Sequence, residues 1–348
     1  MSRPACERRR TTMRAARLHG IGDLRVATEP EPGEPPPGWS LLQVTSVGIC
    51  GSDLHWFVDG GIGENRIEYP VVPGHEFAAV AMTGRYAGRR VAVDPAIPCQ
   101  ECELCLAGQH NLCPTVQFAG HGAVDGALRE YLLWPERLLY PLPDELSDDG
   151  GALLEPLGVA IHAVRVSHLR PGADVLVVGA GPIGQLVVQV ARQQGAAKVF
   201  AVEPLTHRRV SALGAGADAV WPPAGGADAV LDATGGRGVD VVIEVAGTDS
   251  AIGIAVAASR PGARVALAGI PSEDASSFPA ADARRKGLTF AMVRRMLHTY
   301  PRAIAMACNG IDLDGLVTDR YALTDAAKAF VAASERCGDK VVVAVSKS

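Results

Sequence analysis

Four cysteines lie within a short stretch of the chain, in the pattern Cys99-x2-Cys102-x2-Cys105-x7-Cys113. Thiolates at such short spacing can converge on one tetrahedral zinc ion without help from distant parts of the chain. Disulfide frameworks are typical of small secreted domains, and this chain of 348 residues with eight cysteines is neither small nor rich in cysteine. Because four thiolates leave no coordination position open, the pattern predicts a structural zinc site, and the chemistry must lie elsewhere.

Three other segments carry residues that can bind a metal ion. Cys50 lies in Val-Gly-Ile-Cys-Gly-Ser-Asp-Leu-His, His75 and Glu76 lie in Pro-Gly-His-Glu, and Glu155 lies in Leu-Leu-Glu-Pro-Leu-Gly. Taken singly, each has an ordinary structural explanation: a small buried cysteine, a loop histidine, and an acid at a helix N-terminus. Taken together, in one order along one chain, the three segments are hard to explain as ordinary structural residues.

A glycine-rich turn, Gly179-Ala-Gly-Pro-Ile-Gly184, follows the apolar segment 173–178 and precedes a helical pattern at 185–194. In this context the first glycine permits the tight turn, the second lets a pyrophosphate approach the backbone, and the third allows close helix packing. The helix N-terminus then supplies N–H donors to the phosphates. The turn therefore predicts a dinucleotide site.

Glu203 ends the next expected strand, 19 residues beyond Gly184, where a carboxylate can bind the ribose hydroxyls of the cofactor. A 2′-phosphate would meet like charge there, so NAD is expected rather than NADP, although two arginines follow closely. A solvated strand end is the ordinary alternative for this glutamate. The residues expected at the cofactor are Gly179, Gly181, Pro182, Ile183, Gly184, Glu203 and Arg208.

The order of these segments resembles that of the zinc-dependent medium-chain alcohol dehydrogenase superfamily, and most closely its polyol branch, typified by sorbitol dehydrogenase. The resemblance covers nearly the whole chain from Met13. It implies an α/β protein in which a GroES-like, β-rich catalytic domain is interrupted by a Rossmann domain with a doubly wound parallel sheet. We expect the catalytic domain at 13–165 and 299–348, the NAD-binding domain at 166–298, and a basic disordered tail at 1–12.

The resemblance assigns roles around a catalytic zinc ion. Cys50 and His75 match two of its ligands, and Glu155 takes the ligand position that the polyol branch fills with glutamate. Glu76 matches a second acidic residue, which ligates the metal directly or through water, so the third ligand is left open between the two glutamates. With the four-cysteine site, two zinc ions per chain are expected.

A proton relay and a positioning carboxylate also follow from the resemblance. Asp53 matches the carboxylate that orients the histidine ligand. Ser52 matches the relay residue at the substrate oxygen, and His55 matches its solvent end, where an imidazole can accept and release a proton. The metal eases loss of the alcohol proton, and hydride then passes to the nicotinamide ring.

Weaker matches point to the substrate pocket. The residues expected to line it are Trp56, Phe118, His121 and Arg295. The loop 271–285, which shapes the pocket in relatives, departs from the sorbitol pattern, so a cyclitol or aminocyclitol competes with a simple polyol as the substrate. Sugar-acid and threonine-type substrates, a zinc-free reductase and a non-enzymatic NAD-binding relative are the remaining alternatives. The presence of Cys50, His75 and Glu155 argues against the zinc-free reductase. The presence of Ser52 and His55 argues against the non-enzymatic relative.

These residues need two kinds of scaffold. From 13 to 140, short apolar segments such as 40–47 and 90–93 are broken by Gly and Pro, which is typical of an all-β body, with 29–38 as a surface connection. From 171 onward, strands alternate with helices, which predicts a parallel sheet. The strands expected there are 173–178, 198–202, 217–221, 239–245, 264–268 and 288–292. Helices at 303–308 and 324–334 and a strand at 340–345 are expected to return to the first body.

Composition limits the partners. The net charge of −5 gives no reason to expect nucleic acid or an anionic membrane as a partner. No apolar run is long enough to span a bilayer. The first twelve residues are basic and lack the apolar stretch of a signal peptide, so a cytoplasmic protein is expected. The expected partner is a small-molecule alcohol, and the resemblance implies a homodimer or homotetramer.

Overall fold

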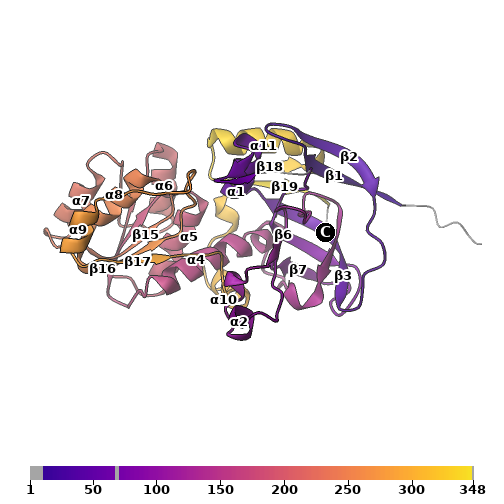
Figure 1. Cartoon of the computed structure of the whole chain (residues 1–348), viewed down its shortest axis with the longest axis horizontal. Helices are drawn as coiled ribbons and strands as arrows, with labels where there is room; N and C mark the ends of the chain where they lie inside the picture. The colour runs from indigo at the N-terminus through magenta and orange to yellow at the C-terminus, as the bar shows by residue number, and fades with distance from the viewer. Residues whose placement is uncertain (1–10, 67–69, 347–348) are drawn as a thin grey trace, which may run out of the picture.

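The computed structural model describes residues 11–66 and 70–346 of the chain. Two bodies, each built on one large sheet, lie next to each other along the long axis of the molecule (Figure 1). The predicted α/β architecture is confirmed, because one sheet is largely antiparallel and the other is entirely parallel.

The body in which the sequence analysis expects the catalytic residues, called the catalytic body below, contains a seven-stranded sheet with the order β11-β7-β6-β3-β19-β18, and β10 also pairs with β3. Its strands are β3 (Trp39–Gly48), β6 (Glu76–Ala81), β7 (Arg90–Val93), β10 (Tyr131–Pro135), β11 (Leu139–Pro141), β18 (Val317–Ala322) and β19 (Lys340–Ala344). Short antiparallel pairs surround this sheet: β1 (Thr12–Leu18) with β2 (Leu24–Pro30), β4 (Gly61–Ile62) with β5 (Asn65–Arg66), and β8 (Ala96–Ile97) with β9 (Gln117–Phe118). The pairing of β19 with β3 joins the C-terminal segment to the N-terminal half of the chain.

The second body contains a six-stranded parallel sheet with the order β14-β13-β12-β15-β16-β17. Its strands are β12 (Asp174–Val178), β13 (Lys198–Val202), β14 (Ala219–Trp221), β15 (Val239–Glu244), β16 (Ser259–Leu267) and β17 (Thr289–Met292). The central strands are almost wholly buried, because helices cover both faces of the sheet. The order of the strands reverses between β12 and β15, which creates a crevice at their carboxyl ends where ligands of such sheets bind.

Helices link the sheets and cover them. Those of the parallel-sheet body are α5 (Pro182–Gln193), α6 (Thr206–Gly214), α7 (Gly226–Ala233), α8 (Asp249–Ala258) and α9 (Ala280–Arg285). The others are α1 (Gly51–Val58), α2 (Glu103–Leu106), α3 (Asp148–Ala152), α4 (Leu154–Val166), α10 (Tyr300–Cys308) and α11 (Ala326–Glu335), with 3-10 turns at His110–Leu112, Glu136–Leu138, Asp314–Leu316 and Leu323–Asp325. One hydrophobic cluster runs from Ala78 through Leu157 of α4 to Val187 of α5, so the two bodies share a core.

Several boundaries differ from the sequence expectations. The helix after the glycine turn begins at Pro182 rather than 185, because the fixed φ of proline suits the first helical position. Strand β16 begins at Ser259, five residues before the expected start. Pro30 still pairs in β2, so the connection expected at 29–38 starts later. Thr12 pairs with Pro30 and belongs to β1 rather than to the tail, and tail residues 1–10 lie outside the described residues. None of the helices in the described ranges is long and apolar enough to cross a membrane.

Candidate active site

The metal-binding cluster forms where β3, α1 and β6 meet. Donor atoms of Cys50, His75 and Glu76 all lie within 4.8 Å of one another. Cys50 precedes the first turn of α1, and Glu76 is the first residue of β6. Gly74 makes this approach possible, because its φ is +97° and a Cβ there would lie 2.8 Å from Val47 Cγ1. One sulfur, one imidazole and one carboxylate in a buried cluster are a donor set that fits zinc.

Asp53 holds two of these donors in place. Its carboxylate accepts the Cys50 backbone N–H at 3.0 Å and the Gly74 N–H at 3.3 Å, and Oδ1 lies 3.4 Å from His75 Nδ1. Burial is the largest single influence and would raise the pKa of Asp53, but the charge of His75 and the hydrogen bonds from His75 and the Cys50 backbone together lower that pKa. Burial alone would lower the pKa of His75, but Asp53 and Cys50 raise it well above its ordinary value. Negative charges that attract a proton to His75 also attract a divalent cation.

Glu76 has a second partner that the sequence analysis missed. Lys340, the first residue of β19, forms an ion pair with Glu76 Oε2 and donates from Nζ to the Ile49 carbonyl at 2.9 Å. Both side chains are buried, with exposed fractions of 3% and 1%. Burial by itself would lower the pKa of Lys340, but Glu76 and Cys50 raise it. The only sequence signal for this role was a lysine at the start of an otherwise apolar strand.

Glu155 lies in the first turn of α4 and is 5% exposed, but it does not join the three-residue cluster at the 4.8 Å distance. Burial is the main factor that raises the pKa of its carboxyl to about 8, and Glu76 adds to this effect while His75 opposes it. These contributions mean that the Glu155 carboxyl lies within electrostatic range of His75 and Glu76. Its assignment as a zinc ligand stays a prediction.

The two relay residues lie one helical turn apart on α1 and differ in exposure. Ser52 is buried, and its Oγ lies 3.5 Å from His75 Nε2, the ring nitrogen left free by the Asp53 contact. His55 is partly exposed, and its Nδ1 lies 2.8 Å from Asp59 Oδ2. Among the described residues no hydrogen bond joins Ser52 to His55. A relay between them therefore needs a bridging group, such as the cofactor ribose that the resemblance implies.

The residues expected to line the substrate pocket do lie together around His75. The His121 ring makes edge contacts with Trp56 at 5.5 Å, Phe118 at 5.0 Å and His75 at 5.6 Å between ring centroids. Phe118 also lies 5.2 Å from His75. Burial, followed by the charge of His75, lowers the pKa of His121 to about 3, so this imidazole is neutral at physiological pH. The wall beside the metal cluster is thus aromatic and uncharged.

Arg295 closes this wall from the other body. Its guanidinium carbon lies 4.2 Å from the centroid of the Phe118 ring. Burial lowers the pKa of Arg295 to about 10, and Nη1 is buried with no hydrogen-bond partner among the described residues. A buried guanidinium nitrogen normally has an acceptor, so this side chain is suited to bind a hydroxyl in the cleft.

The four-cysteine loop forms a separate lobe, residues 99–113, and its four sulfurs lie within 4.8 Å of one another. Backbone N–H groups donate to three of the sulfurs, from Cys99 to Cys113, from Cys102 to Cys99, and from Cys105 to Cys102, each at 3.4 Å. Donors from the Glu101 and Cys102 backbone lower the pKa of Cys99 to about 6. The pKa of Cys113 is also lowered, whereas burial raises the pKa of Cys105 to about 12. The convergence of the four sulfurs fits a structural zinc ion, and none of the described cysteines forms a disulfide.

The glycine turn has the geometry of a dinucleotide site. Gly179 has a φ of +96°, and Gly181 precedes α5, which has proline in its first turn. A Cβ on Gly184 would lie 2.0 Å from the Gly179 carbonyl oxygen, so only glycine permits this packing. The N-terminus of α5, with Pro182 and Ile183 in its first turn, is free to receive a phosphate.

Glu203 ends β13 beside this turn. Its Oε2 accepts the Ala180 N–H at 2.7 Å, and its Oε1 accepts the Leu205 N–H at 2.9 Å. Arg208 lies over Gly181, with Nη1 3.3 Å from the position of a Cβ there, and donates to the Gly338 carbonyl at 3.2 Å. Glu203 therefore supports the turn in addition to any role at the ribose, and Arg208 joins the turn to the catalytic body.

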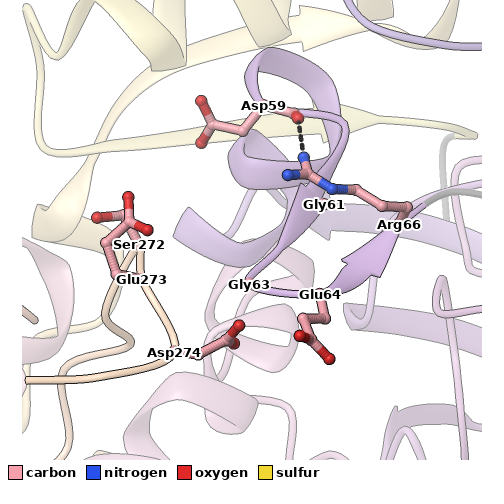
Figure 2. A pocket seen from close by; sticks show the side chains of 8 residues that line it. All are labelled: Asp59, Gly61, Gly63, Glu64, Arg66, Ser272, Glu273 and Asp274. Atoms are coloured by element: carbon pink, nitrogen blue, oxygen red, sulfur yellow. Dashed lines mark hydrogen bonds between the residues drawn. The ribbon is translucent and has the colours of Figure 1, made fainter.

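An acidic pocket of about 530 Å³ lies between the two bodies (Figure 2). The β4–β5 hairpin faces the segment 272–274, and a Cβ on Gly63 would lie 2.0 Å from Asp274 Oδ1. The pocket is lined by Asp59, Gly61, Gly63, Glu64, Arg66, Ser272, Glu273 and Asp274. The sequence gives no sign of this pocket beyond the unusual 271–285 loop, since the approach of that loop to the hairpin is a tertiary contact.

Two family models match the chain. Residues 36–144 match the alcohol dehydrogenase GroES-like domain, and residues 182–309 match the zinc-binding dehydrogenase domain. Sorbitol dehydrogenase of Bacillus subtilis strain 168 is 35% identical over 320 residues, which cover 89% of this chain and 90% of the relative. Sorbitol dehydrogenase of Bos taurus is 36% identical over 338 residues, which cover 94% of each.

Solved structures agree with these matches. An oxidoreductase of unknown specificity from Escherichia coli, ECK1772, superposes with a TM-score of 0.91 at 29% identity, covering 97% of this chain and all of that one. A zinc-binding dehydrogenase of Sinorhizobium meliloti 1021, bound to NADP, gives 0.87 at 30% identity, covering 96% and 100%. The metal cluster, the glycine turn and these likenesses lead to one conclusion. The chain is a zinc- and nicotinamide-dependent oxidoreductase that belongs to the polyol branch of the medium-chain alcohol dehydrogenase family.

Proposed function

We propose that the protein oxidises a secondary alcohol of a polyol, cyclitol or aminocyclitol to the ketone, with NAD as the hydride acceptor. The observation that carries this proposal is the Cys50–His75–Glu76 cluster beside an uncharged aromatic wall. Zinc held by these donors would supply a Lewis acid that lowers the pKa of the alcohol hydroxyl. Proton transfer, orientation of the alcohol and exclusion of water fall on the side chains of this chain.

Ser52 is the first acceptor of the alcohol proton. Its Oγ lies beside His75 Nε2, and therefore at the metal-facing side of the imidazole. His55 takes the proton at the solvent side, with a bridging group such as the cofactor ribose between it and Ser52, and Asp59 stabilises the imidazolium that results. Trp56, Phe118 and the neutral His121 exclude water from the reacting carbon, which protects hydride transfer.

The preference for NAD rests on Glu203. Its two oxygens are fixed by backbone N–H groups, so the carboxylate keeps its place at the end of β13 and repels a 2′-phosphate. Arg209 donates to the Glu203 and Pro204 carbonyls and to Thr206 Oγ1, which occupies much of its donor capacity. The Sinorhizobium meliloti structure contains NADP, so the two cofactors must be compared directly.

The charge of the pocket between the two bodies bears on the substrate class. Four carboxylates and one guanidinium line the pocket between the bodies (Figure 2). An anionic sugar acid would be repelled there, whereas a neutral polyol or a cationic aminocyclitol would not. Arg295, with an unpartnered Nη1 among the described residues, offers a donor to a substrate hydroxyl deeper in the cleft.

Zinc stoichiometry and location belong to the same proposal. The two donor clusters support two zinc ions per chain, one catalytic and one structural. Thiolate clusters of this kind persist in a reducing compartment, which supports a cytoplasmic protein.

A homodimer or homotetramer is also proposed. The strand β17 supports it, because β17 is an outer strand of the parallel sheet and Met292 on it is 77% exposed. Sedimentation equilibrium tests this part of the proposal, and a monomer at micromolar concentration would refute it.

The decisive experiment is a panel of alcohols, each tested with NAD and with NADP by absorbance of the reduced nicotinamide. The panel contains linear polyols, cyclitols, aminocyclitols and sugar acids. The proposal expects turnover with a vicinal diol of one of the first three groups, and a kcat/KM for NAD that exceeds that for NADP. Turnover confined to sugar acids, or to NADP, would refute the corresponding part.

A further inference from the structure

The segment that carries Arg295 has an unusual backbone. This linker, residues 293–299, joins β17 to α10. Arg295 and His298 both have a φ of +53°, in the left-handed region that residues with a Cβ avoid. Such a conformation persists only where surrounding contacts determine it, and it is often found at ligand sites. The contacts of the linker are therefore informative.

The four-cysteine lobe supplies contacts on one side of the linker. Asn111 Nδ2 donates to the Arg294 carbonyl at 2.9 Å, and this asparagine is 8% exposed. His298 Nε2 lies 3.2 Å from the Gly108 carbonyl oxygen, and the rings of His298 and His110 meet edge to face at 4.7 Å. These contacts lie on both sides of Arg295 along the chain. Asn111 binds the preceding residue, Arg294, and the other two contacts are made by His298.

Helix α4 supplies contacts on the other side. A Cβ on Gly158 would lie 2.5 Å from Met296 Sδ and 2.6 Å from Thr299 Oγ1. Glycine at this position therefore lets the linker pack closely against α4. Met296 is 8% exposed. The linker is thus held between the lobe and α4, and Arg295 extends from it to the Phe118 ring.

We propose that Asn111 is a positioning residue for substrate binding. By holding the Arg294 carbonyl it fixes the left-handed turn at Arg295 and the place of the guanidinium over Phe118. The four-cysteine lobe thereby sets substrate affinity in addition to stabilising the catalytic body. This inference rests on the proposed function only in the claim that Arg295 meets a substrate hydroxyl.

The first test measures the linker without substrate. Hydrogen exchange of the amides in 294–298 is followed in the zinc-loaded protein. Asn111→Ala is expected to raise their exchange rates about fivefold to tenfold, as loss of one hydrogen bond allows. His298→Ala, which changes an exposed side chain, is also expected to raise these exchange rates. The second variant keeps the test decisive if Asn111→Ala folds poorly. Leu112→Ala, a neighbouring and 43% exposed change in the lobe, serves as the matched control with unchanged exchange.

The second test is a double-mutant cycle on the kinetics. In the wild-type background Asn111→Ala is expected to raise KM for the alcohol about fivefold to tenfold, with kcat and the zinc content unchanged. In an Arg295→Ala background the same substitution is expected to change KM less than twofold.

Each outcome decides the inference. The inference would be overturned if amide exchange were unchanged in both Asn111→Ala and His298→Ala. It would also be overturned if the KM effects of Asn111→Ala and Arg295→Ala multiplied in the double variant, because Asn111 would then be structural only. A wild-type protein that oxidises no alcohol would refute the proposed function and the substrate contact of Arg295. The exchange measurement would still show whether the lobe holds the linker.

Discussion

Asp53 offers the sharpest test of how the metal cluster is built. The substitution Asp53→Asn keeps the size of the side chain but removes its charge, and it turns one acceptor into a donor. Asp53 accepts from Cys50 N at 3.0 Å and Gly74 N at 3.3 Å and lies 3.4 Å from His75 Nδ1. An amide NH2 group must therefore face either the Cys50 N–H, or the Gly74 N–H together with His75 Nδ1, so a contact that holds one of the metal donors is lost. Loss of such a partner lowers metal affinity about 10- to 100-fold, or about 1.4 to 2.7 kcal/mol.

Zinc affinity of the catalytic site is measured by competition with a chelator of known affinity, and the four-cysteine site, which the substitution does not touch, serves as an internal reference. The matched control is Asp59→Asn, because Asp59 also pairs with a histidine, His55, but is 53% exposed and lies on the solvent side of α1. The control is expected to leave zinc affinity unchanged and to affect turnover alone. A change below twofold for Asp53→Asn, or an equal change in both variants, would refute the reasoning.

Three further predictions address other parts of the molecule. Cys102→Ser should reduce zinc from two ions to one per chain and lower the free energy of unfolding by about 2 kcal/mol or more, as measured by metal analysis and urea denaturation. Glu203→Gln should raise KM for NAD about tenfold and lower the preference for NAD over NADP, since it removes the charge that repels a 2′-phosphate; kinetics with both cofactors test this. Lys340→Met should lower the free energy of unfolding of the zinc-free protein by about 3 to 5 kcal/mol at pH 7, because Glu76 loses its buried partner. Since the pKa of Lys340 is raised, this difference should persist up to about pH 10.5 and fade above it, as urea denaturation at pH 7 and pH 11 would show.

Much of the fold and the core of the site could be predicted because their signals are local. The glycine turn from Gly179 to Gly184 requires a strand before it and a helix after it, and both are present. The four-cysteine spacing places its sulfurs together within one loop. The meeting of Cys50 and His75 at one site could not be predicted from local spacing, because the two residues lie in different segments. The family resemblance predicted that they meet, and the pairing of β3 with β6 brings them together.

The remaining features depend on contacts between distant segments. Lys340 and Glu76 meet only because β19 pairs with β3, which itself pairs with β6. The acidic pocket needs the β4–β5 hairpin to face 272–274, and the contact of Asn111 with Arg294 joins residues 183 positions apart. No periodicity or short motif encodes such pairings. The left-handed backbone of Arg295 also has no sequence signal, because arginine rarely adopts it.

The central claim is that Cys50, His75 and their neighbours hold a working zinc ion that is distinct from the ion of the four-cysteine lobe. The most direct measurement combines zinc content and alcohol turnover in the wild type and in Cys50→Ser. The account predicts two zinc ions per chain in the wild type, one in the variant, and a fall in kcat/KM of about a thousandfold or more. One zinc ion in the wild type, or undiminished turnover in Cys50→Ser, would contradict it.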